Sequence, residues 1–288
     1  MNIVTTVLPV LLIVLTGYAI GRWKELDFSA LVELIYYVTA PALIFSSLVQ
    51  SDISGEELYW MSIATVGVVG VLALLALGFF LVSRKKMSGK ALPLIFGNTG
   101  YLGFPIALLA FGNDGLSRAV VYSGIETLLM FTIGIAIVTG KADFRETVRS
   151  PFLYVIVLGI LFSQFAAPFP SWLLTAIGMI GQATIPLALI LLGYRLSRIA
   201  VKQFHVPLVM GCWKIGAGFL IGFGIASLVP LSPLGRAIVI LEAGMPAAVF
   251  TYILGERFRS DPELISSVVF ISTAMSVVTI PLVLLFIS

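Results

Sequence analysis

The feature that most constrains the fold is a series of long apolar runs, bounded by charged residues, glycine or proline, that fills nearly the whole chain. A membrane-spanning helix needs about 20 such residues. Only 11% of the residues are charged, whereas a soluble domain carries about 25%. Because backbone polar groups in lipid must be satisfied within their own segment, these runs predict membrane-spanning α-helices.

Ten spans are expected, and they leave no room for a separate soluble domain. They cover residues 3–21, 30–50, 59–83, 90–111, 116–140, 151–168, 171–194, 204–229, 234–254 and 263–287. Fourteen of the 17 lysines and arginines fall in the odd-numbered loops, whereas the even-numbered loops hold only Arg118 and Arg236. Positively charged loops stay in the cytoplasm, so this bias places both termini outside and supports an even number of spans.

The two halves of the chain share a pattern of prolines. The segment YYVTAPALIFSSL around Pro41 resembles GQATIPLALILLGY around Pro186, and the segment around Pro105 corresponds to that around Pro246. The offsets of 145 and 141 residues are close to half of the 288-residue chain. An odd number of spans per half inverts the second copy, so we expect an all-α membrane protein of two inverted five-helix repeats. The expected repeats are residues 1–140 and 151–288, joined by a cytoplasmic linker at 141–150.

Helix-breaking residues cluster in the fourth and ninth spans, as GNTGYLGFP at residues 97–105 and EAGMP at residues 242–246. Proline lacks an N–H group and glycine permits a sharp bend, so both helices are expected to break and cross. Ends that start at Pro105 and just after Pro246 would offer N–H groups to a carboxylate. Ends that close near Asn98 and Glu242 would offer carbonyl groups to a cation. The alternative is two kinked but continuous helices.

Three ionisable residues lie well inside spans, where a charge is costly and marks a functional site by default: Glu126, Lys214 and Glu242. Glu242 adjoins the broken segment, so it is predicted to hold the coupling ion, either as a Na+ ligand or as a proton carrier. Glu126, with Ser123 and Thr127 beside it, is either functional or structural. Lys214 either holds the substrate carboxylate or neutralises a glutamate, and neutralisation is favoured.

The segments GNTGYLGFP and MPAAVFTYILGERFRSDPELIS resemble the fourth-helix and ninth-helix motifs of the auxin efflux carrier family. This family includes plant auxin exporters and bacterial malonate or malate transporters. The resemblance extends over the whole chain. It implies ten helices with the fourth and ninth crossed, a scaffold of spans 1, 2, 6 and 7, a transport domain of spans 3–5 and 8–10, and a homodimer.

Individual residues carry this resemblance. Asn98 matches the family's substrate-contacting asparagine, and Pro105 and Pro246 match the crossover prolines. The segment EAGM at 242–245 resembles the sodium site of the distantly related bile acid:sodium symporters, with Pro246 in place of their glutamine. The resemblance therefore favours Na+ coupling and leaves H+ coupling open.

These patterns predict a secondary active transporter for a small organic anion, and the resemblance implies an auxin-like, malonate-like or malate-like carboxylate. It would act in a bacterial inner (plasma) membrane by elevator-type alternating access, coupled to Na+ or H+. An anion channel or an uncoupled facilitator of the same fold is the alternative. The expected substrate contacts are Asn98, Thr99, Gly100, Pro105, Gly244, Met245 and Pro246, and the expected coupling-ion contacts are Glu242, Asn98, Ser123, Glu126 and Thr127.

Other classes of protein fit the sequence less well. The only histidine, His205, lies at a predicted helix start, so a Ser–His pair within the membrane is not expected. The chain has no H-E-x-x-H motif and no phosphate-binding loop, so we expect neither an enzyme nor an ATPase. No nucleic-acid partner is expected, and the one candidate cofactor is Na+ at Glu242.

Overall fold

The computed structural model describes residues 3–84, 87–141, 145–165, 169–201 and 203–287. These residues form helices, turns and short links, with no β-strand among them, so the predicted all-α class is confirmed. Residues 142–144 of the predicted linker lie outside the described residues, as do the loop lysines Lys85, Lys86 and Lys202.

The first half of the chain contains several helices that are interrupted or distorted. They are α1 (Ile3–Trp23), α2 (Ser29–Leu34), η1 (Ile35–Thr39), α3 (Ala40–Val49), α4 (Gly55–Val82), η2 (Gly89–Ala91), α5 (Leu92–Ile95), η3 (Thr99–Gly103), α6 (Phe104–Leu129), η4 (Met130–Gly134) and α7 (Ile135–Thr139). Helices α2, η1 and α3 run on without a break, and η1 is a π-helical turn just before Pro41. A widened turn accommodates a proline, which cannot donate to the preceding turn.

The second half repeats the same kinds of interruption. It contains α8 (Arg145–Arg149), α9 (Pro151–Gln164), α10 (Ser171–Gln182), α11 (Thr184–Arg198), α12 (His205–Leu228), α13 (Pro233–Ala243), α14 (Val249–Arg257) and α15 (Pro262–Ile287). Helices α10 and α11 meet at Ala183, three residues before Pro186. Pro41 and Pro186, which were paired by sequence, therefore both follow closely on a helix distortion.

Seven helical segments of the described chain are long and apolar enough to cross a membrane without interruption. The other predicted spans do not count as such segments for physical reasons. Helix α9 is described over only 14 residues, and the fourth and ninth spans are interrupted. The remainder of the fourth span and the fifth span count as one segment, Thr99–Thr139, because α6 contains both. Within this segment Gly112 has a left-handed backbone (φ 68°), so α6 is kinked there.

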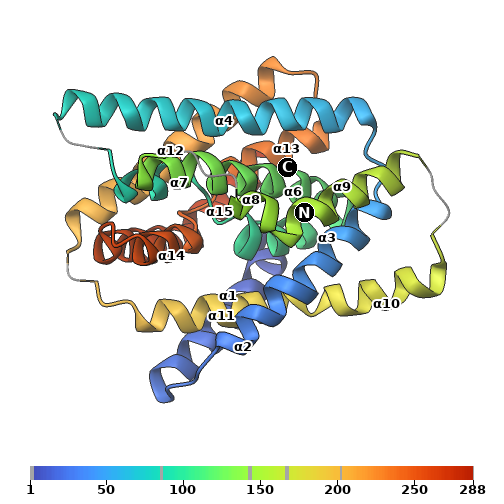
Figure 1. Cartoon of the computed structure of the whole chain (residues 1–288), viewed down its shortest axis with the longest axis horizontal. Helices are drawn as coiled ribbons and strands as arrows, with labels where there is room; N and C mark the ends of the chain where they lie inside the picture. The colour runs from blue at the N-terminus through green and yellow to red at the C-terminus, as the bar shows by residue number, and fades with distance from the viewer. Residues whose placement is uncertain (1–2, 85–86, 142–144, 166–168, 202, 288) are drawn as a thin grey trace.

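The helices pack in two groups. In the first group, α1 packs along α11, and α3 packs against α9 and α10. A Cβ atom at Gly17 or at Gly193 would overlap a carbonyl of the facing helix, so glycine is what allows α1 and α11 to touch backbone to backbone. Figure 1 shows α4 along one edge of the molecule and the α10–α11 pair along the opposite edge.

In the second group, α12 packs against α4, α13 and α15, and α6 packs against α4 and α13. A buried ion pair ties three of these helices together near their ends. Arg118 on α6 donates to both oxygens of Glu57 on α4, at 3.0 Å and 2.7 Å, and the Ser232 hydroxyl at the start of α13 donates to the same carboxylate. The two charged side chains are each 11% exposed, so this cluster fixes α4, α6 and α13 relative to one another.

Candidate functional site

The fourth-span and ninth-span helices are both broken, and the broken segments contact each other. The chain is extended at Phe96 between α5 and η3, and residues 244–248 separate α13 from α14. Gly97 and Ala247 pair as an antiparallel bridge. The Asn98 N–H donates to the Pro246 carbonyl at 2.7 Å, and the Ala248 N–H donates to the Phe96 carbonyl at 3.0 Å. The alternative of two continuous, kinked helices is therefore excluded.

Each break creates a new helix N-terminus. After the first break the helix restarts at Thr99, and after the second it restarts at Val249. The first N–H groups of a helix have no intrahelical acceptor and carry the positive end of the helix dipole. The sequence predicted that the first of these helices restarts at Pro105. It restarts six residues earlier, at Thr99. The π-helical turn η3 absorbs the proline, so Pro105 lies inside a continuous helical segment.

Both helix N-termini open onto one cavity of about 170 Å³, which lies between the two packing groups. From the second group it is lined by residues 97–101, Phe104, Ser123, Gly124, Thr127, Met130, Phe131, residues 248–250 and Ile253. From the first group it is lined by Val32, Ile35, Tyr36, Ala40, Ile44, Phe152, Ile156, Thr184, Ile185 and Ala188. A movement of one group against the other would therefore open or close this cavity.

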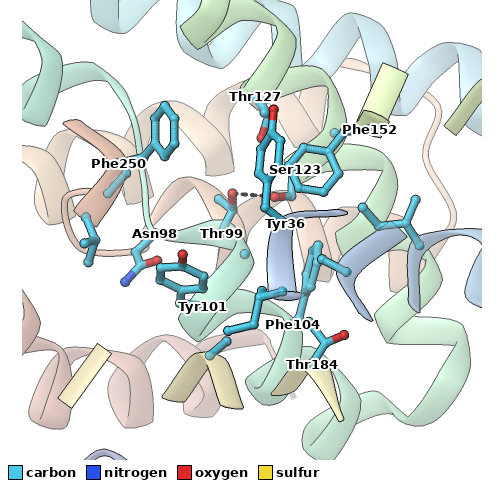
Figure 2. Close-up of a pocket in the computed structure, with 18 of the residues that line it drawn as sticks. Tyr36, Asn98, Thr99, Tyr101, Phe104, Ser123, Thr127, Phe152, Thr184 and Phe250 are labelled. Atoms are coloured by element: carbon cyan, nitrogen blue, oxygen red, sulfur yellow. Dashed lines mark hydrogen bonds between the residues drawn. The ribbon is translucent and has the colours of Figure 1, made fainter. Parts of the chain in front are cut away.

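The cavity wall is largely apolar and aromatic (Figure 2). The rings of Tyr36 and Phe152 meet edge to face at 5.0 Å, and Phe131 and Phe250 meet in the same way at 5.3 Å. No charged side chain lines the cavity among the described residues. Tyr36 and Thr184 add hydroxyl groups from the first packing group, and the broken fourth-span helix and α6 supply a polar wall.

Asn98 is the residue of this wall with an uncommitted donor. Its backbone is held at the crossing by the bond to Pro246, and its carbonyl accepts from Leu102 and Gly103, both at 3.2 Å. The side chain is 4% exposed, and Nδ2 has no hydrogen-bond partner. A buried amide donor without a partner is costly, so this group is suited to a ligand that can accept a hydrogen bond.

Glu126 lies behind this wall and organises it. Its Oε1 accepts from the Gly97 N–H at 2.8 Å, and its Oε2 accepts from the Thr99 hydroxyl at 2.8 Å. The Thr99 and Ser123 hydroxyl oxygens are 2.9 Å apart, joined by the dashed line in Figure 2. Because the Thr99 proton goes to the carboxylate, Ser123 donates to Thr99. Glu126 is 2% exposed and does not line the cavity, so it fixes the extended segment from behind.

Glu242 lies near the end of α13 and has no hydrogen-bond partner. It is fully buried, and neither Oε1 nor Oε2 accepts a hydrogen bond. Its carboxylate packs against Gly103, where a Cβ atom would overlap the carboxylate and lie 2.6 Å from its carbon. A carboxylate this buried and unsatisfied requires a proton or a cation. Its role at the coupling-ion site stays a prediction.

Lys214, on α12, is the third buried ionisable group, at 1% exposure. Its ammonium donates to the Ala243 carbonyl, at the last residue of α13, over 3.0 Å. Within the described part of the chain, no ion pair within 4.0 Å joins it to Glu126 or Glu242. The ammonium therefore contacts a helix end directly, and its role in neutralising a glutamate stays a prediction.

The predicted site residues separate into two sets. Asn98, Thr99, Gly100, Ser123 and Thr127 line the cavity. Pro105, Gly244, Met245, Pro246, Glu126, Glu242 and Lys214 do not, and Met245 is fully buried behind the crossing. Sequence reasoning placed a helix N-terminus just after Pro246, and α14 starts at Val249, but residues 248–250 were not among the predicted contacts. It also missed the aromatic wall, for which a chain with 20 phenylalanines offers no local signal.

A second cavity, of about 550 Å³, adjoins the first. Val249 and Ile253 line both cavities, so they form the wall between them. The second cavity is also lined by Tyr194, Arg195 and Arg198 at the end of α11, by Tyr252 and Glu256 on α14, and by Glu263 and Ser266 on α15. Arg198 pairs with Glu25 at 3.0 Å, whereas Arg195 forms no ion pair within the described residues.

The chain is similar to known transport proteins along its whole length. A family model described as "Membrane transport protein" matches residues 2–144 and 138–284. Two transporters of uncharacterised substrate, from Methanocaldococcus jannaschii and Methanothermobacter thermautotrophicus, are each 31% identical to the chain, over 96% of either sequence. A candidate malonate transporter of Rhizobium meliloti is 26% identical, over 95% of this chain and 92% of the relative.

These comparisons agree with the resemblance seen in the sequence. The apolar helices make the protein a multi-pass membrane protein. The family and the names of the relatives indicate a membrane transporter and not an enzyme, as predicted. The chain belongs to the membrane transport protein family, that of the auxin efflux carriers.

Proposed function

We propose that the protein is a secondary active transporter that moves a small organic carboxylate across a prokaryotic plasma membrane. The observation that carries this proposal is the convergence of two helix N-termini, at residues 99–101 and 248–250, on one cavity between two packing groups. Unpaired N–H groups and two positive dipole ends bind an anion without a charged side chain. The free Nδ2 of Asn98 supplies a further donor to the same ligand.

The proposed topology is ten crossings in two inverted five-helix repeats, with both termini outside. The paired breaks and the paired distortions at Pro41 and Pro186 support it, as does the alternation of basic loops. We assign the first packing group to the scaffold and the second to the transport domain, and the packing of α1 with α11 and of α3 with α9 and α10 supports this assignment. Movement of the second group against the first would carry the cavity between the two sides as an elevator, and a homodimer would anchor the scaffold.

The second cavity supports access to the site from the cytoplasm. By the proposed orientation, the end of α11 and the end of α14 face the cytoplasmic side. Arg195, half-buried and without an ion pair among the described residues, lies on this route together with Arg198, Glu256 and Glu263, so charges of both signs line the vestibule. Val249 and Ile253 would then form the thin gate between this vestibule and the site.

The coupling ion is proposed to act at Glu242. This carboxylate lies behind the crossing, in contact with Gly103, so its charge state affects the helix segment that carries the substrate groups. A proton or a Na+ would each satisfy its two unpartnered oxygens. Binding of either would favour the arrangement in which the substrate site is complete.

The walls of the cavity bear on the class of substrate. Aromatic rings and the absence of charged lining residues in the described chain favour a carboxylate with an apolar body. The relative from Rhizobium meliloti points instead to malonate, whose two carboxylates could each face one helix N-terminus. Indole-3-acetate, malonate and malate are therefore the three anions to compare.

The test is a thermal-denaturation screen of the purified full-length protein with these three anions, across pH and in sodium or potassium salts. A bound ligand stabilises the folded state, so a carboxylate-specific rise in Tm identifies the substrate. Uptake of the radiolabelled anion into proteoliposomes then tests transport. If no small carboxylate raises Tm and none is taken up, the proposed function is wrong.

The same uptake assay separates a carrier from the channel alternative. A coupled carrier accumulates the anion above its external concentration when a cation gradient is imposed. A channel or an uncoupled facilitator only equilibrates it, and a channel does so with a measurable conductance. Equilibration without accumulation, under both sodium and proton gradients, would favour the uncoupled alternative.

A further inference from the structure

A lysine ammonium occupies the negative end of the broken ninth-span helix. Helix α13 ends at Ala243, and its last carbonyl groups have no intrahelical donor. These carbonyls carry the negative end of the helix dipole, which attracts a cation. Nζ of Lys214 lies 3.0 Å from the Ala243 carbonyl oxygen, and the lysine is 1% exposed. The cation that the end of α13 attracts is therefore the ammonium of Lys214, a residue of the same chain.

The remaining oxygens near this point do not form a site for a resident Na+. A sodium ion in a protein takes several oxygen ligands. Both oxygens of Glu126 already accept hydrogen bonds, from Gly97 and Thr99. The Ala243 carbonyl accepts from the ammonium. Both oxygens of Glu242 lack a hydrogen-bond partner, but a Na+ bound there, beside the helix end that the ammonium occupies, would be repelled by the lysine.

The position of the ammonium is built into the packing. A Cβ atom at Gly97 or at Gly218 would lie 3.3 Å from Nζ, so glycine leaves the space that the ammonium fills. A Cβ atom at Gly218 would also overlap the Ala243 carbonyl, so α12 approaches the end of α13 closely at this residue. The extended segment at Gly97 and helix α12 at Gly218 therefore shape the pocket around the charge.

We infer that the Lys214 ammonium is a tethered cation that takes the place of a coupling Na+ at the end of α13, and that ligand binding and transport are consequently independent of Na+. The charges of Glu126 and Glu242 both act on this ammonium. Removing it leaves two buried carboxylates and an unsatisfied helix end with no cation. That vacancy would recruit a small cation from solution.

The test compares the full-length wild type with Lys214→Gln by thermal denaturation in NaCl and in choline chloride at equal ionic strength. The wild type should have the same Tm in both salts. Lys214→Gln should have a Tm higher in NaCl by on the order of 2 °C or more, rising saturably with Na+. The matched control is Lys141→Gln, at an exposed lysine, which should behave as the wild type.

Two results would overturn the inference: a saturable, Na+-specific rise in the Tm of the wild type, or equal Tm values in both salts for a folded Lys214→Gln. If that variant is not recovered as a folded protein, Lys214→Gln/Glu126→Gln removes one charge of each sign and is judged by the same comparison.

The transport part of the inference rests on the proposed function, but the comparison of Tm values does not. Na+-stimulated uptake by wild-type proteoliposomes would refute the role of Lys214. A complete lack of carboxylate uptake would count against the proposed function. The comparison of Tm in NaCl and in choline chloride would still show whether the ammonium or a Na+ occupies the end of α13.

Discussion

Replacing Asn98 by alanine should have opposite effects on ligand binding and on the stability of the free protein. The Nδ2 group is buried and has no partner in the free protein. Such a group costs about 1–3 kcal/mol of stability. Its backbone bonds, to Pro246, Leu102 and Gly103, are independent of the side chain and persist in alanine. The free variant should therefore be as stable as the wild type or more stable.

The affinity for the anion should fall at the same time. A hydrogen bond to a charged group contributes about 1.5–3 kcal/mol, so Asn98→Ala should weaken carboxylate binding by about 10-fold to 100-fold. The measurement is a titration of Tm against the anion found in the screen, together with the apparent KM for uptake. Asn113→Ala is the matched control, because Asn113 is exposed and lies outside the cavity.

This reasoning would be refuted by either of two results. One is a free Asn98→Ala protein that loses several degrees of Tm, which would mean that the amide serves the fold. The other is unchanged affinity in a stable variant, which would mean that the amide does not contact the ligand. Loss of both properties together would likewise assign Asn98 a structural role.

Three further changes test other parts of the site. Gly103→Ala places a Cβ atom on the Glu242 carboxylate, and overpacking of this kind costs about 1–3 kcal/mol, so Tm and coupled uptake should both fall. The control is Gly216→Ala, which has open space around it and should leave Tm unchanged or raise it. Glu242→Gln should give a folded protein that no longer accumulates the anion, and full ion-driven uptake would exclude the coupling role. Glu57→Gln leaves the Arg118 charge buried and unpaired, so the free energy of unfolding, measured by denaturation in detergent, should fall by about 3 kcal/mol. A fall in this free energy of less than about 1 kcal/mol would show that the pair is solvated.

The breaks were predictable because their cause is local. Proline and glycine act on their own backbone, and they cluster at residues 97–105 and 244–246 whatever the rest of the chain does. The exact restart of the helix was not predictable in the same way. It depends on a π-helical turn, η3, that absorbs Pro105 and moves the N-terminus back to Thr99.

The partners of the buried charges could not be derived from the sequence. Glu126 is 29 residues from Gly97 and Lys214 is 29 residues from Ala243, and only tertiary packing brings each pair together. Sequence reasoning offered an ion pair for Lys214 because it considers side-chain charges and not helix ends. The aromatic wall could not be predicted for the same reason, because Tyr36 and Phe152 come from helices that meet only in the folded protein.

The two breaks also explain why one crossing can hold an anion on one side and fixed charges on the other. Each broken helix contributes an N-terminus to the cavity and a C-terminus behind it, so the dipoles would separate the proposed anion from the charges behind the crossing. Among the described residues, no acidic or basic side chain lines the cavity. Lys214 and Glu242 both lie on the C-terminal side, away from the anion. The extended segments that join the helix halves are held by two backbone hydrogen bonds and by Glu126. If Glu242 carries the coupling ion and the cavity holds the anion, as proposed, these segments form a rigid connection between the two sites.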